Sequence, residues 1–102
     1  MDKVLSTEEI TTRIGNTFMA NGTWDSDGYR YRGNLANGRI ASAYAVDRDG
    51  MIHAMLQVPG SGGLSTSFQL FADDATDERI NRFIVHMVKT HTKALEAPAL
   101  TW

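Results

Sequence analysis

Apolar and polar positions follow two different periods along this chain, and the change of period separates helices from strands. Near the N-terminus three apolar residues recur at helical spacing: Ile10, Ile14 and Phe18. Ser6 precedes this run, and Glu9 follows three residues later, which is the pattern of a capping box. The pattern therefore predicts a first helix at about residues 7–20, ended by Asn21-Gly22.

From residue 23 to residue 72 apolar and polar residues alternate, which is the period of strands. Turn sequences rich in Asp, Asn and Gly divide this region into four expected strands, at residues 29–34, 39–46, 51–58 and 65–72. The short separations between them predict antiparallel neighbours in chain order. In the third strand, one face should pack on the helices and carries Ile52, Ala54, Leu56 and Val58. The other face carries Met51, His53, Met55 and Gln57.

The last predicted helix, at about residues 76–95, has one apolar and one basic side. Six apolar residues recur at helical spacing: Ile80, Phe83, Ile84, Met87, Val88 and Leu95. The opposite side carries five basic residues, named here the basic stripe: Arg79, Arg82, His86, Lys89 and Lys93. At 100° per residue these five positions fall within roughly 80° of one another. One side of this helix should therefore dock on the core, and the other presents a line of positive charge.

Together these elements predict an α+β fold with both helices on one face of a four-stranded antiparallel β-meander. The N-terminal helix, the sheet and the C-terminal helix form one domain at residues 1–96, a size that suits a single hydrophobic core. Residues 97–102 should form a C-terminal tail, because Pro98 cannot continue the helix.

Composition narrows the classes of function. The net charge of −2 gives no overall attraction to nucleic acid or membranes, so anion binding must come from local arrangements of charge. The lack of cysteine excludes disulfides, thiolate metal sites and a cysteine nucleophile. No apolar run approaches the roughly 20 residues needed to span a bilayer, and residues 1–9 contain no secretory h-region. We therefore expect a cytoplasmic protein that does not contact a membrane.

No metal or cofactor is expected. Asp25-x-Asp27 and Asp47-x-Asp49 begin like calcium loops of the EF-hand kind, which need a Glu at position 12. Ala36 and Val58 stand at those positions, so the aspartates are better explained as turn residues of hairpins.

The basic stripe is the main candidate for an anion- or partner-binding surface, and Arg30 and Arg32 are added to it. Strand alternation places these two arginines on one face of the sheet, and Tyr29 and Tyr31 on the other. That separation weakens a nucleic-acid site in which bases stack on aromatic rings beside basic groups. A solvated helix face that complements the helix dipole explains the stripe as well.

Two further sets of residues are candidates for function. The sheet face opposite the helices is more apolar than a solvated face needs, which predicts a homodimer or partner contact. Its candidate interface residues are Met51, Met55 and Phe71, joined by Trp102 of the tail. His53 is the candidate catalytic residue, as a general base with Asp47 or Asp49 nearby in the same hairpin.

These patterns favour a non-catalytic binding protein that engages an acidic protein partner through the basic stripe. A nucleic-acid-binding protein that uses the same stripe for phosphates is the first alternative. A small acid–base enzyme centred on His53 is the second.

Overall fold

The computed structural model describes residues 3–35, 38–58 and 65–96, and within these it leaves undescribed the side chains of Ser65 and of residues 90–96. Helix α1 comes first, five strands follow, and a 3₁₀ turn leads into helix α2. Their bounds are α1 Thr7–Phe18, β1 Ala20–Trp24, β2 Tyr31–Asn34, β3 Ile40–Arg48, β4 Met51–Gln57, β5 Ser65–Phe71, η1 Ala72–Asp74 and α2 Asp77–Glu96.

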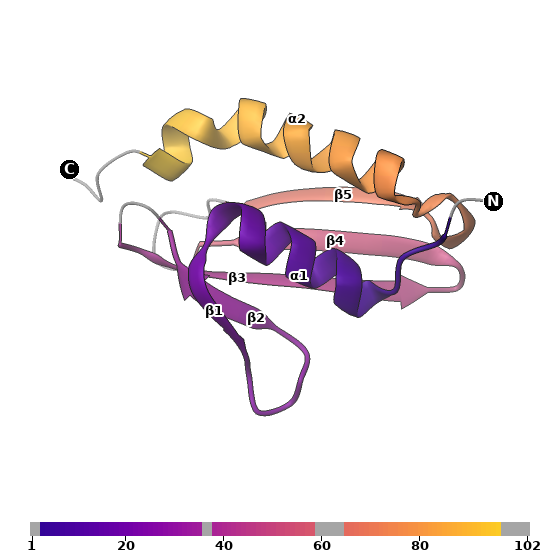
Figure 1. Ribbon diagram of the computed structural model, residues 1–102, viewed down its shortest axis with the longest axis horizontal. Coiled ribbons are helices and arrows are strands. Elements are labelled where there is room, and N and C mark those ends of the chain that lie inside the picture. The colour runs from indigo at the N-terminus through magenta and orange to yellow at the C-terminus, as the bar shows by residue number, and fades with distance from the viewer. Residues whose placement is uncertain (1–2, 36–37, 59–64, 97–102) are drawn as a thin grey trace.

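The five strands form one antiparallel sheet in the order β1-β2-β3-β4-β5, with each strand beside its neighbour in the chain (Figure 1). The predicted α+β class and antiparallel meander are confirmed. The predicted number of strands is wrong, because the described residues form five strands and not four. Helix α1 packs mainly against β3, and α2 lies along β5.

The strand that the sequence pattern missed is β1. The first helix ends at Phe18, and Met19 already has extended backbone, so residue 20 belongs to a strand rather than to the helix. Asn21 does not end the helix: its φ of 54° and the shift in register between Ala20 and Thr23 mark an irregularity within β1. The Asn-Gly pair reads as a helix stop in sequence, but a β-bulge uses the same left-handed backbone.

The first expected strand, at residues 29–34, is shorter in the structure. Strand β2 begins at Tyr31, and residues 29 and 30 belong to the loop that connects it to β1. The carboxylate of Asp25 accepts hydrogen bonds from the backbone N–H groups of Tyr29 (2.9 Å) and Arg30 (3.3 Å). These two residues therefore serve the loop closed by Asp25, which is why they do not continue the ladder of β2.

The core lies against one face of the sheet. The predicted inward residues Ile52, Ala54 and Leu56 are at most 3% exposed, and Phe68 and Leu70 of β5 are also buried. The buried residues that β3 contributes to this face are all alanines, which leaves room for the close approach of α1. The helices add Ile10, Ile14, Ile80, Ile84 and Met87. Val88, expected on the apolar side of α2, is 37% exposed.

The N-terminal ends of the two helices are fastened together. The predicted capping box of α1 is confirmed, because Ser6 and Glu9 exchange two hydrogen bonds of 3.1 Å. Just before it, the N–H of Leu5 donates to the carbonyl of Ala75 (2.8 Å), at the start of α2. Arg13 of α1 pairs with Asp77 of α2 (2.6 Å), so the two helices leave this end of the molecule side by side.

Candidate functional site

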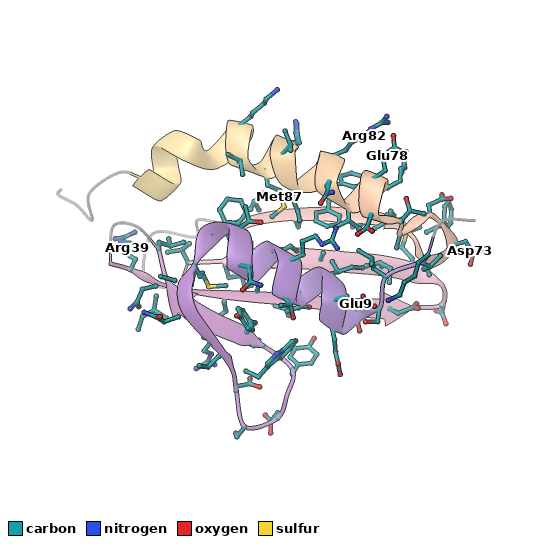
Figure 2. The ribbon with its side chains drawn as sticks, in the orientation of Figure 1. Glu9, Arg39, Asp73, Glu78, Arg82 and Met87 are labelled. Atoms are coloured by element: carbon teal, nitrogen blue, oxygen red, sulfur yellow. The ribbon has the colours of Figure 1, made fainter. Side chains whose placement is uncertain are left out.

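The basic stripe lies on the surface. Its four members with described side chains are exposed, namely Arg79, Arg82, His86 and Lys89, and the side chain of Lys93 lies outside the described residues. Ile80, Ile84 and Met87 of the same helix are buried. Figure 2 shows Met87 directed from α2 toward the sheet, whereas Arg82 points away from it. The helix thus presents basic groups to the solvent over about three turns.

Part of this positive charge is compensated within α2. The guanidinium of Arg82 contacts the carboxylate of Glu78 at 2.9 Å, an exposed pair one helical turn apart. The guanidinium of Arg79 lies 5.8 Å from the centre of the Phe83 ring. Exposed ion pairs contribute only about 0–1 kcal/mol to stability, so a partner's carboxylate can displace Glu78 at small cost.

Phe83 connects the stripe to the sheet. Its ring stacks on that of Phe68 in β5, with centroids 4.7 Å apart and planes 6° from parallel. Arg79 lies against the same Phe83 ring. The side of α2 that carries Arg79 and Phe83 is therefore fixed beside β5, at the edge of the sheet.

Arg30 lies in an aromatic cluster on the sheet face opposite the core. The rings of Tyr29 and Tyr44 stack with centroids 5.6 Å apart, and the Arg30 guanidinium lies 5.4 Å from the Tyr44 ring and 6.0 Å from the Tyr29 ring. The predicted separation of Tyr29 from Arg30 is wrong, because residue 29 lies in the loop, where strand alternation does not apply. Tyr31 behaves as predicted: it turns to the core side, packs against Gly15 and Trp24, and donates a hydrogen bond to Asn16.

The loop that carries this cluster contains a carboxylate, that of Asp25, whose pKa is lowered. Backbone hydrogen bonds, chiefly from the N–H of Tyr29, hold the pKa of Asp25 below its ordinary value. Asp25 is therefore ionised at neutral pH, and it fixes the backbone of the two residues that form the cluster with Tyr44.

Tyr44 also borders a shallow hollow of about 180 Å³ on this face. The hollow is lined by Tyr44, Val46, Arg48, His53, Ala54, Met55, Ser67, Phe68 and Gln69. The Tyr44 hydroxyl donates to the sulfur of Met55 at 3.1 Å. Basic, polar and apolar groups meet here, and no carboxylate is among the lining residues. The arrangement suits binding of an anionic or aromatic group better than acid–base chemistry.

His53, the catalytic candidate, lies in this hollow without either aspartate predicted beside it. In the register of β3 and β4 it pairs with Val46, whereas Asp47 pairs with Ile52 and so belongs to the opposite face. The Asp47 carboxylate instead accepts the N–H of Gly50 at 3.0 Å in the hairpin turn. Asp49 occupies the turn itself, with a φ of 53°.

The described candidate interface residues lie on the sheet face opposite the core. Met51 of β4 and Phe71 of β5 are register partners, Met51 and Met55 are half-buried, and Phe71 is 62% exposed. Trp102 lies outside the described residues. Phe71 lies beside Met51, whereas Met55 lies farther along β4, opposite Ser67. The role of these residues as a dimer interface stays a prediction.

Two residues of this face were not predicted from the sequence. Tyr44 and Arg48 lie on β3, and only the register of that strand brings them beside Arg30 and His53. The alternation within residues 39–46 was the available signal, but alternation does not say which loop folds over a strand.

No protein-family model matches the chain, and neither a curated protein nor a solved structure is significantly similar to it. Within the described residues, no three His, Asp or Glu side chains gather closely enough to hold a metal ion. No described helix is long and apolar enough to cross a membrane.

Proposed function

We propose that this protein is a non-catalytic binding protein that engages an acidic protein partner through the basic stripe of α2. The observation that supports it best is the exposure of Arg79, Arg82, His86 and Lys89 together, opposite a buried apolar side. Basic groups gathered on one helix face attract carboxylates over a distance, which gives fast and salt-sensitive association.

Both helices are inferred to cover the same sheet face, which leaves the other open for a partner. Two observations support this arrangement. Phe68 stacks on Phe83 of α2, and its register partner Ala54 is buried. Helix α1 packs mainly against β3, where the buried Ala43 is the register partner of the buried Leu56.

The test is fluorescence anisotropy with a labelled glutamate-rich peptide at low and at physiological salt. The double charge reversal Arg82→Glu/Lys89→Glu should weaken binding at least tenfold, and added salt should weaken binding to the wild type. The matched control is Arg32→Glu/Arg48→Glu, which makes the same change of charge away from α2. Equal losses in the two variants would point to net charge alone and would contradict a site on the stripe.

A nucleic-acid-binding protein is the second candidate, and the cluster of Tyr29, Tyr44 and Arg30 favours it. Stacked aromatic rings beside a guanidinium accept single-stranded bases, and Arg32 and Arg48 extend the positive charge. The same two variants test this candidate with a labelled single-stranded RNA or DNA as the probe. Here Arg32→Glu/Arg48→Glu is the test variant and Arg82→Glu/Lys89→Glu is the control. Loss of binding in Arg32→Glu/Arg48→Glu alone would support the open sheet face. Loss in the α2 variant alone would support the stripe as the phosphate surface.

The acid–base enzyme centred on His53 stays a third proposal. It requires the imidazole to exchange its proton near neutral pH beside a reacting group. An NMR titration of His53 tests it, and a midpoint near the ordinary value of about 6.5 would remove its main support.

A further inference from the structure

Strand β5 forms one edge of the sheet. Its seven residues pair with β4 in an unbroken register, from Gln57↔Ser65 to Met51↔Phe71. Within the described residues no strand pairs with its other side. An edge strand carries a row of N–H and C=O groups that another extended segment can pair with. The outer side of β5 therefore offers backbone groups for strand addition.

The hairpin between β3 and β4 determines which residues of β5 point outward. Asp49 and Gly50 have φ values of 53° and 83°, as in a type I′ turn, whose flanking residues Arg48 and Met51 form a hydrogen-bonded pair. The antiparallel alternation then directs the backbone groups of Ile52, Ala54 and Leu56 toward β5. The register partners of these three residues on β5 form backbone hydrogen bonds to them. The residues that alternate with those partners, Ser67, Gln69 and Phe71, therefore direct their N–H and C=O groups to the free edge. The hydrogen bond from the N–H of Ala72 to the carbonyl of Gly50 (2.7 Å) agrees with this alternation, because residue 72 should again point toward β4.

Strand β5 itself lacks the sequence features and the irregular backbone that usually protect edge strands. Residues 65–71 contain no charged residue and no proline, and their register shows no bulge. The opposite edge of the sheet, β1, is shorter and has a shifted register at Asn21. Irregular backbone makes β1 a poor template, whereas β5 is regular along its whole length.

One basic residue of α2, Arg79, is linked to β5 through the ring of Phe83. Phe83 stacks on Phe68 of β5, and Arg79 lies against the Phe83 ring. Asn81, which contacts Arg13 of α1, projects about 160° away from Phe83 around the helix. The flank with Arg79, Phe83 and His86 is therefore turned away from α1, toward the outer side of β5, where Figure 1 shows α2 running.

We propose that the acidic partner supplies an extended segment, which adds to the outer edge of β5 as a sixth strand beside α2. This inference rests on the proposed function, and it specifies how the partner binds. Backbone pairing with Ser67, Gln69 and Phe71 supplies affinity, and acidic side chains of the segment contact the near flank of the stripe at Arg79. A second copy of this chain fits less well, because twofold pairing through β5 would bring two basic stripes together.

Gln69→Pro is the decisive variant. It removes one outward N–H and leaves the bonds to β4 intact, and proline is tolerated on an edge strand with that geometry. The control Gln69→Ala removes the same side chain and keeps the N–H. The probe is a labelled ten-residue peptide that alternates Glu with Val and Thr, compared with a version N-methylated at alternate residues. We expect at least tenfold weaker binding for Gln69→Pro and for the methylated peptide, and no more than a twofold change for Gln69→Ala.

The outcomes separate this inference from the proposed function. If Gln69→Pro binds like the wild type while Arg82→Glu/Lys89→Glu does not, the stripe stands and strand addition is overturned. If the wild type binds neither the glutamate-rich peptide nor the alternating peptide at low salt, the proposed function itself fails. Amide exchange of the wild type gives a test that needs no variant: the peptide should slow exchange at Ser67, Gln69 and Phe71. Thr66, Phe68 and Leu70 should be protected already without it.

Discussion

At the scale of single residues, Gly15 sets the distance between α1 and β2. A Cβ at this position would meet the ring of Tyr31, which is held in place by Trp24 and by its hydrogen bond to Asn16 (2.9 Å). Alanine favours helices over glycine by about 1 kcal/mol in exposed positions. Steric overlap in a packed position costs about 1–3 kcal/mol, which outweighs that preference.

We therefore expect Gly15→Ala to lower the free energy of unfolding by about 1–2 kcal/mol. In a Tyr31→Ala background the ring is absent, and the same substitution should be neutral or stabilising. Urea denaturation of the four proteins in this cycle measures both effects. A loss of the same size in both backgrounds would contradict the contact with Tyr31 as the cause.

Two carboxylates link stability to pH. Backbone hydrogen bonds, from Ser6 for Glu9 and chiefly from Tyr29 for Asp25, hold both pKa values below their ordinary range in the folded protein. A lowered pKa in the folded state means that folding favours the ionised form. The resulting stability is fully present above the pKa of the unfolded chain and is lost as pH falls through the folded pKa.

We predict that the wild type loses stability between roughly pH 5 and pH 2, and that Asp25→Asn and Glu9→Gln lose less over the same range. The amide variants keep a hydrogen-bond acceptor but cannot be protonated. Thermal unfolding followed by circular dichroism at a series of pH values measures the difference. Parallel pH profiles for the wild type and both variants would contradict the assignment.

At the scale of elements, turns and caps determine where each helix and strand ends. The capping box starts α1, the type I′ turn fixes the register of β3 and β4, and the irregularity at Asn21 shapes β1. The turn matters most for the proposed binding mode. The hydrogen-bonded pair that flanks it sets the alternation of backbone groups across β4 and β5, and so determines which groups of β5 point outward.

Gly50→Ala should destabilise the protein by about 1–2 kcal/mol, because Gly50 has a φ of 83° and a side chain there is strained. Nothing lies within 4 Å of a Cβ at this position, so the cost is conformational rather than steric. Asp49→Asn, at a φ of 53°, should be neutral, since asparagine is common in this type of turn. Chemical denaturation compares them, and an unchanged Gly50→Ala would contradict the turn assignment.

At the scale of the whole molecule, the two candidate surfaces occupy different sides. The stripe lies on α2, which runs along β5, whereas the cluster at Arg30 and the hollow at His53 lie on the sheet face opposite the core. This separation allows one partner to be tested on each surface without disturbing the other.

The predicted homodimer belongs to this scale. Phe71→Glu should shift a dimer formed through the open face toward monomer at least tenfold, because it places charge in an apolar contact and costs the fold little at 62% exposure. Val85→Glu, at 52% exposure on α2, is the control and should change nothing. Light scattering across a concentration series is the measurement. A wild type that stays monomeric at high micromolar concentration would contradict the dimer.

The sequence by itself determined the elements whose signals are local. The capping box at Ser6 and Glu9 and the alternation from Ile52 to Leu56 each depend on neighbours a few residues apart, and both predictions are confirmed. The amphipathic pattern of α2 is local in the same way and is confirmed except at Val88, which is exposed. The same local pattern predicted the exposed side of α2 that carries the stripe. It did not predict that Arg82 pairs with Glu78.

Which features lie together depends on the tertiary structure. Asn21-Gly22 has the same local preference in a helix stop and in a bulge, and pairing with β2 selects the strand. Tyr29 joins Arg30 and Tyr44 because the loop closed by Asp25 folds against β3. The backbone groups of β5 that point outward are determined by the hydrogen-bonded register of β3 with β4 and of β4 with β5. Each depends on contacts between residues distant in the chain, and local propensity carries no information about these.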